Sequence, residues 1–223
     1  MFRAYLYIIV ISLVMVGCND PDTAKKLEQK SENVDQGLSG TASKTSNTAE
    51  ALMKEIQTIA KSDFRKAKWG MPRNKVKLTE ADDPIGENDS DIIYSRKVAG
   101  MDALMGYVFV EDKLVKAKYM FQQQHSDSNA YITDYNNLKK ALETKYGKAK
   151  REKALWSNDL YTNIPAEWGE ALSLGYLTYL SYWNTKNTQI SLLLKGENYK
   201  IDFWLEYKSR ALANLEEKVS KKQ

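Results

Sequence analysis

The chain has very little of the two residue types that most often carry chemistry. Its 223 residues include one cysteine and one histidine. A single cysteine excludes an intramolecular disulfide. One cysteine and one histidine are also too few ligands for a zinc site of the Cys/His type. His125 lies in a polar stretch, Gln122 to Asp127, which is typical of a solvated loop. A Ser-His-Asp or Cys-His catalytic system would have to use this one histidine as its base.

Sequence motifs of the common enzyme classes are also missing. The chain has no Gly-x-Ser-x-Gly nucleophile elbow, and neither a phosphate-binding loop nor a dinucleotide-binding glycine pattern. The acidic loop 81–91 does not have the ligand spacing of an EF-hand, which favours a solvated loop over a calcium site. A glycosidase with two carboxylates stays open, because its two acids can lie anywhere in a chain. We therefore expect a protein that is not an enzyme and holds no metal or cofactor.

The sequence has no large excess of charge of one sign. Its 33 basic and 29 acidic residues give a formal net charge of +4. Such a near balance creates no strong field for nucleic acid, so we expect no nucleic-acid partner. Basic residues do gather from Lys208 to Lys222. This pattern favours a solvated helix end, with contact to anionic lipid head groups as the alternative.

The N-terminal hydrophobic run is too short to span a bilayer. It extends over residues 4–17, directly after Arg3, whereas a membrane-spanning helix needs about 20 apolar residues. Its length and flanks are typical of a secretory signal. The run ends in Val14-Met15-Val16-Gly17-Cys18, which resembles the lipobox of bacterial lipoproteins. The alternative is an uncleaved signal anchor.

This resemblance implies export from the cytoplasm and a lipid anchor in a membrane. Residues 1–17 would be a signal peptide that is removed, and Cys18 would become the lipidated N-terminus. Several acyl chains make a durable membrane anchor, where one binds only marginally. In the lipoproteins of Gram-negative bacteria, aspartate after the cysteine suggests retention in the inner membrane. Because Asn19 stands at that position, we expect the outer membrane, with the protein facing the periplasm.

Composition divides the rest of the chain into three parts. Residues 18–47 contain no aromatic residue and would bury too little to order themselves, so we expect a flexible tether. An α+β domain follows at 48–210, and the tail 211–223 has the spacing of a basic helix.

Period-two alternation predicts most of the domain. It indicates strands at 92–98, 104–110 and 114–121, then at 150–156, 174–182, 188–194 and 199–207. Apolar spacing predicts a helix at 135–146, and Pro72 begins a shorter one. The element order indicates an approximate duplication of an α-β-β-β unit, in halves of about 63–121 and 131–208. We expect one antiparallel sheet with helices on one face.

Two family resemblances concern this domain. Trp69-Gly70-Met71-Pro72, with Val76 four residues later, resembles the entry to the domain of outer-membrane assembly lipoproteins of the BamE/SmpA type. The doubled element order is similar to the tandem repeats of the β-lactamase inhibitory protein fold. The first resemblance implies a role in envelope assembly, and the second implies inhibition of a periplasmic hydrolase.

The tryptophans are the candidates for partner contacts. Trp156, Trp168 and Trp183 lie at predicted strand ends or in the loop 158–171. Most tryptophans in such places belong to the core, but exposed ones are enriched in binding hot spots. We expect an envelope protein as partner, bound by the open sheet face or by the loop 158–168. A periplasmic hydrolase inhibitor is the first alternative, and an envelope hydrolase that uses carboxylates is the second.

Overall fold

A computed structural model describes residues 62–215, which lie within one compact unit, 54–223. The expected signal peptide, Cys18, the tether and most of the C-terminal tail lie outside the described residues. The described elements are α3 (Arg73–Lys77), β1 (Gly86–Glu87), β2 (Asp91–Val98), β3 (Met101–Val110), β4 (Lys113–Phe121), α4 (Asn129–Tyr146), β5 (Arg151–Trp156), the 3-10 turn η2 (Pro165–Glu167), α5 (Trp168–Ser173), β6 (Leu177–Asn184), β7 (Thr188–Glu197) and β8 (Lys200–Ser209).

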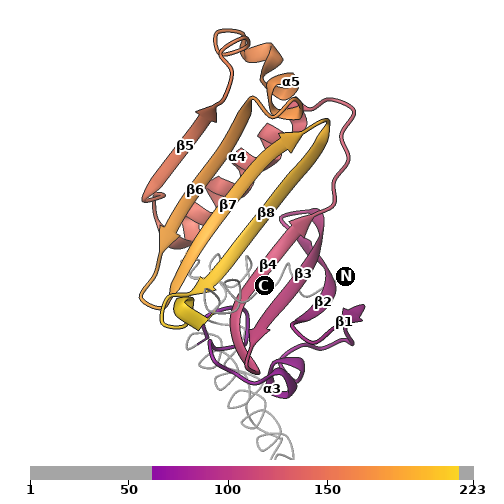
Figure 1. The fold of residues 1–223 in the computed structure, drawn as a ribbon, viewed down its shortest axis with the longest axis vertical. Helices are drawn as coiled ribbons and strands as arrows, with labels where there is room; N and C mark the ends of the chain where they lie inside the picture. Colours follow the sequence, from indigo (N-terminus) through magenta and orange to yellow (C-terminus); the bar gives the residue numbers. More distant parts are fainter. Residues whose placement is uncertain (1–61, 216–223) are drawn as a thin grey trace, which may run out of the picture. The chain divides into compact units, whose positions relative to one another are not determined.

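All eight strands form one antiparallel sheet, in the order β1-β2-β3-β4-β8-β7-β6-β5 (Figure 1). Each half of the domain contributes four strands, and the last strand of each half lies at the centre. There β4 pairs with β8, and Met120 lies opposite Trp204. The two halves are therefore joined through residues far apart in the sequence.

The expected α+β class, with helices on one face in both halves, is wrong. Strands hold 42% of the described residues and helices 23%, so the fold is mostly sheet. Among the helices described in residues 62–215, only α4 is longer than six residues. The repeat is thus a repeat of strands, not of α-β-β-β units.

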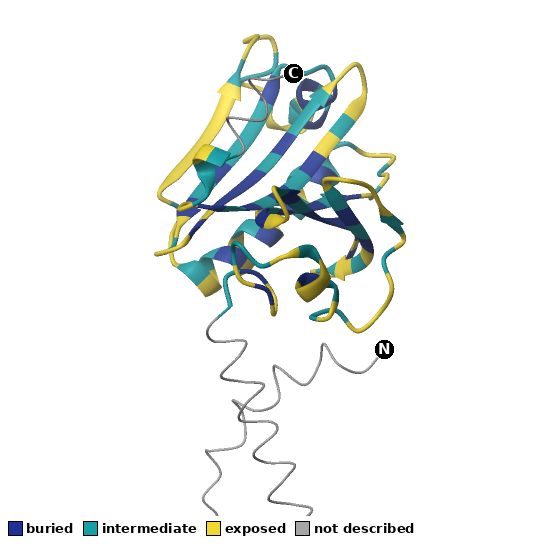
Figure 2. Cartoon of the chain, turned by 60° about the horizontal axis from the view of Figure 1, so that its bottom comes forward, coloured by how far each residue is buried: buried dark blue, intermediate teal, exposed yellow. Residues whose placement is uncertain are grey.

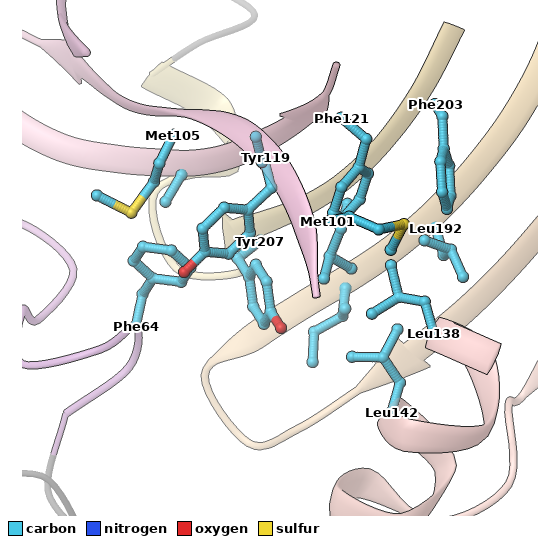
Figure 3. Close-up of a cluster of buried hydrophobic side chains, with 14 of the residues drawn as sticks. Phe64, Met101, Met105, Tyr119, Phe121, Leu138, Leu142, Leu192, Phe203 and Tyr207 are labelled. Carbon is cyan, nitrogen blue, oxygen red and sulfur yellow. The ribbon is translucent and has the colours of Figure 1, made fainter. Parts of the chain in front are cut away.

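Between residues 62 and 121 the first half has no long helix, because the sequence ends α3 early. The helix α3 begins after Pro72 and has five residues, of which only Val76 is buried. Leu78 is already exposed, and the loop with Pro84 follows. Phe64 fills the space instead. Its ring lies 4.9 Å from that of Tyr207 and 5.5 Å from that of Tyr119 (Figure 3).

The second half has the helix that the sequence predicts, with an earlier start. The 18-residue α4 runs behind β6 and β7 in Figure 1. Leu138 and Leu142 point into the core beside Leu192 (Figure 3). The hydroxyl of Tyr135 lies 2.7 Å from that of Ser181 on β6. One face of the sheet is therefore the core face, and α4 covers part of it.

The segment 158–171, expected to be a loop, contains η2 and α5. Two glycines permit its close packing. A Cβ on Gly169 would lie 2.4 Å from the backbone nitrogen of Asn129, and one on Gly196 would lie 2.0 Å from the carbonyl oxygen of Leu172. These contacts hold α5 against α4 and β7.

Candidate binding surface

The face of the sheet opposite α4, here called the outer face, is not covered by any helix within residues 62–215 (Figure 1). Strand alternation decides which side chains it carries. Phe203 and Leu205 belong to the core, so Trp204 between them points outward. Leu192 and Leu194 likewise belong to the core, so Leu193 lies on the outer face of β7. Figure 2 shows the alternation as bands of different burial along the strands.

An unbroken row of apolar side chains crosses the outer face. The register pairs each member with the next across five adjacent strands. All five are neither fully buried nor fully exposed. The members of this apolar row, from β6 through β7, β8 and β4 to β3, are Leu180, Leu193, Trp204, Met120 and Leu104.

Trp204 and Lys118 form the centre of this surface. The ammonium nitrogen of Lys118 lies 4.4 Å from the centre of the Trp204 ring. Burial lowers the pKa of Lys118, because the ammonium is partly removed from water. The strands β4 and β8 diverge beside this pair and leave a shallow hollow, to which Gln122 and Ile201 also contribute.

Charges flank the apolar row on both sides. The Lys195 ammonium lies 3.3 Å from the carboxylate of Asp202, and that of Lys116 lies 3.6 Å from the carboxylate of Glu206. Both acidic side chains that β8 turns to this face are therefore already balanced by a lysine.

The three tryptophans proposed from the sequence lie elsewhere. Trp183 is only 1% exposed and donates its indole N–H to the carbonyl of Gly147 at 2.9 Å. It is a core residue and offers no surface to a partner. Trp156 and Trp168 do come together, with ring centres 6.0 Å apart in an edge-to-face contact.

This tryptophan pair lies beside a second apolar surface, at the end of the sheet near α5. Its exposed side chains include Leu155, Leu160, Ile164 and Tyr199. The Trp168 indole N–H donates to the carbonyl of Thr162 at 3.3 Å, which fixes the 158–168 segment. The edge strand β5 runs up to this end and is exposed along nearly its whole length (Figure 2).

A buried ionic network lies on the core side of the first half. The Glu80 carboxylate is 2% exposed and accepts hydrogen bonds from Arg65 at 2.9 Å and from Arg96 at 2.8 Å, as well as from the Tyr107 hydroxyl. Burial alone would raise the pKa of Glu80, but the hydrogen bonds from Arg65 and Tyr107 outweigh it and hold the pKa below its usual range. Glu80 is thus a fixed anion that ties the segment before β1 to β2 and β3. It is not a group that exchanges protons near neutral pH.

His125 has a structural contact and no catalytic partner set. Its ring nitrogen Nε2 lies 2.7 Å from the carboxylate of Asp134, and its ring packs edge-to-face on Tyr131. Within residues 62–215, no three His, Cys, Asp or Glu side chains gather as metal ligands would.

Trp204 is the surface residue that the sequence analysis missed. The signal was present, since the alternating residues of β8 on the core face place Trp204 on the opposite side.

None of the helices described in residues 62–215 is long and apolar enough to cross a membrane. Searches of protein-family models, curated proteins and solved structures found no match.

Proposed function

We propose that this protein is a lipid-anchored envelope lipoprotein that binds another protein through the outer face of its sheet. The observation that carries the proposal is the unbroken apolar row from Leu180 to Leu104 on a face that no described helix covers. Monomeric soluble proteins rarely leave contiguous apolar surface of this kind exposed without a use for it. Trp204 at its centre is the residue type most enriched at binding hot spots.

The anchor in this proposal is the lipid on Cys18, after a signal peptide of residues 1–17. The tether 18–47 would carry the domain away from the outer membrane into the periplasm. The domain itself acts without catalysis, as an assembly factor or as an inhibitor, and the identity of its partner decides between the two.

The test is capture of the partner from membranes of cells that make the full chain. Leu193→Asp places a charge in the middle of the apolar row, and we expect it to remove the captured protein. Asn137→Asp makes the corresponding change at an exposed position of α4 and should leave capture unchanged. Loss with both variants, or with neither, would contradict the outer face as the binding surface. Cys18→Ser should move the protein out of the membrane fraction, and its retention there would contradict the lipid anchor.

A further inference from the structure

The dimensions of the apolar row suit one kind of binding segment. Adjacent strands lie about 4.8 Å apart, so a row that crosses five strands is about 19 Å long. A helix rises 1.5 Å per residue, and about 13 residues therefore cover that length. The row runs across the strands and is one side chain wide. This matches the narrow apolar stripe of an amphipathic helix.

The polar neighbours of the row make other occupants poor fits. Two residues along each strand, the row is bordered by Tyr182, Ser191 and Glu206 on one side and by Thr178 and Lys195 on the other. A bilayer would need a broad apolar surface. An extended peptide would pair with the free edge of β5 through its backbone and leave the face untouched.

The charge of this surface selects among amphipathic helices. Counted to four residues on either side of the row, the outer face of β4, β5, β6, β7 and β8 carries seven basic side chains and three acidic ones, a surplus of 7 − 3 = +4. The seven basic residues are Lys116, Lys118, Arg151, Lys153, Lys195, Lys200 and Lys208. Of the three acids, Asp202 and Glu206 each lie within 4 Å of a lysine and Glu197 lies opposite Lys200, so the face as a whole attracts an anion.

Lys118 gives that attraction a specific place. Glu206 lies opposite Lys118 in the strand register but contacts Lys116 at 3.6 Å, no ion pair of Lys118 is found within residues 62–215, and its ammonium rests on the indole of Trp204. Burial has already removed part of its water and lowers its pKa. A carboxylate from a partner would therefore meet a cation that is partly desolvated and held at the centre of the row, where charge-assisted hydrogen bonds are strongest.

We infer that the partner binds this protein with an acidic amphipathic helix, laid along the row from Leu180 to Leu104 with a carboxylate on Lys118. The inference rests on the proposed function and names the binding segment. Apolar side chains of that helix contact Leu193, Trp204 and Met120. Its acidic side chains face Lys118 and Arg151 along one border of the row and Lys195 along the other.

The experiment is site-specific photo-crosslinking with the full, lipidated chain in living cells. A photo-reactive amino acid is placed at Leu193 and, separately, at Met120, with Asn137 on α4 as the control. The crosslinked protein is digested, and mass spectrometry identifies the partner segment. We expect both outer-face positions to capture the same segment, about 13 residues or more long, with apolar residues at helical spacing and an excess of Asp and Glu. The control should not capture it.

A charge exchange completes the test. Lys118→Glu should reduce the crosslinking yield from Leu193 at least tenfold, and Glu→Lys or Asp→Lys in the captured segment should restore it. Lys148→Glu, at an exposed position outside the outer face, should leave the yield unchanged. A captured segment that is basic, extended or without an apolar stripe would overturn the helix while leaving the binding face in place. Crosslinks to lipid alone, or no crosslink from either outer-face position, would overturn both proposals.

Discussion

Lys118 and Trp204 come from different halves of the chain, and their contact exists only because β4 and β8 are neighbours. The ammonium nitrogen lies 4.4 Å from the ring centre, and the two residues stand diagonally across the central strand pair. A cation on an aromatic face contributes roughly 0.5–1 kcal/mol at an exposed site. That gain competes with the loss of water around the ammonium, which lowers the pKa of Lys118. The contact is therefore better suited to binding than to stability.

Lys118→Met should leave the melting temperature unchanged or raise it. Methionine keeps a flexible apolar chain over Trp204 and removes the desolvated charge. Because the pKa of Lys118 is lowered in the folded state, the folded protein loses this proton at a lower pH than the unfolded chain. Its stability therefore rises with pH between the folded and the ordinary lysine pKa. The variant should lack that rise, as measured by thermal unfolding from pH 7 to 11.

The control for this prediction is Lys116→Met on the same strand. Lys116 faces Glu206 at 3.6 Å, with the two side chains 20% and 19% exposed, and loss of this pair should lower stability by about 1 kcal/mol. If Lys118→Met were the more damaging of the two, the Lys118 ammonium would be a stabilising group, and the argument for a poised cation would fail.

Substitution of Trp183 should lower stability, whereas substitution of Trp204 should weaken partner binding. Trp183→Phe removes the indole donor to the Gly147 carbonyl and shrinks a side chain that is 1% exposed. We expect a loss of about 1–3 kcal/mol, measured by urea unfolding. Trp204→Phe removes part of a ring that is only partly buried and should cost less than about 1 kcal/mol, while reducing partner capture. The reverse pattern would show that the core and surface roles of these tryptophans are exchanged.

Glu80→Gln should destabilise the protein at neutral pH. The variant removes the carboxylate that Arg96, whose side chain is 13% exposed, contacts at 2.8 Å, and leaves it paired with Asp82 alone. Removing one member of a buried ion pair costs about 3–5 kcal/mol, and the lower end is expected because Arg96 keeps Asp82 and because Arg65 is 40% exposed.

Acid should reproduce part of this effect in the wild type. The folded-state pKa of Glu80 is lowered, so its contribution is complete above the ordinary glutamate pKa and is lost as pH falls through the folded value. Chemical unfolding between pH 7 and pH 2 should therefore show wild type and Glu80→Gln converging at low pH. Parallel curves would mean that the Glu80 charge contributes nothing.

Two glycine substitutions in strands should differ sharply. A Cβ on Gly196 would lie 2.0 Å from the Leu172 carbonyl oxygen, a backbone atom that cannot turn away. Gly196→Ala should cost about 3 kcal/mol or more in urea unfolding, the upper range for overpacking. A Cβ on Gly106 meets no atom within 4 Å, so Gly106→Ala should change stability by less than about 1 kcal/mol. Equal effects would show that α5 does not pack closely on β7.

Local patterns predicted the strands better than their arrangement. Alternation located β2, β3, β4 and β7 within a few residues, because each has one face in the core. It failed at Tyr199, which was expected to begin the last strand but lies in a turn with a positive φ and is 64% exposed. The pairing of β4 with β8 has no local signal, since Lys116 and Lys208 meet only through the global fold.

The equivalence of the two halves and the choice of binding residues could not be decided from local patterns. Pro72 was read as the start of a short helix and α3 does follow it, but the sequence from Leu78 to Pro84 ends this helix after five residues, and Phe64 takes over the core position. Trp156 and Trp168 were chosen by type, without the pairing that brings them together. Trp204 was missed because alternation identifies the buried face of β8, and Trp204 lies on the opposite face.

The strand order also determines when the sheet can close during synthesis. Until β8 has emerged, β4 has one edge with unpaired backbone groups, and β7 likewise lacks a neighbour. Such edges invite pairing with other chains, and long-range strand pairing is slow. The sheet closes through Lys116–Met120 and Trp204–Lys208, the latter within the last strand of the domain. The β4 edge of the first half therefore stays unprotected until residues 204–208 have been made, which separates the first half from its stable form by more than 80 residues of synthesis.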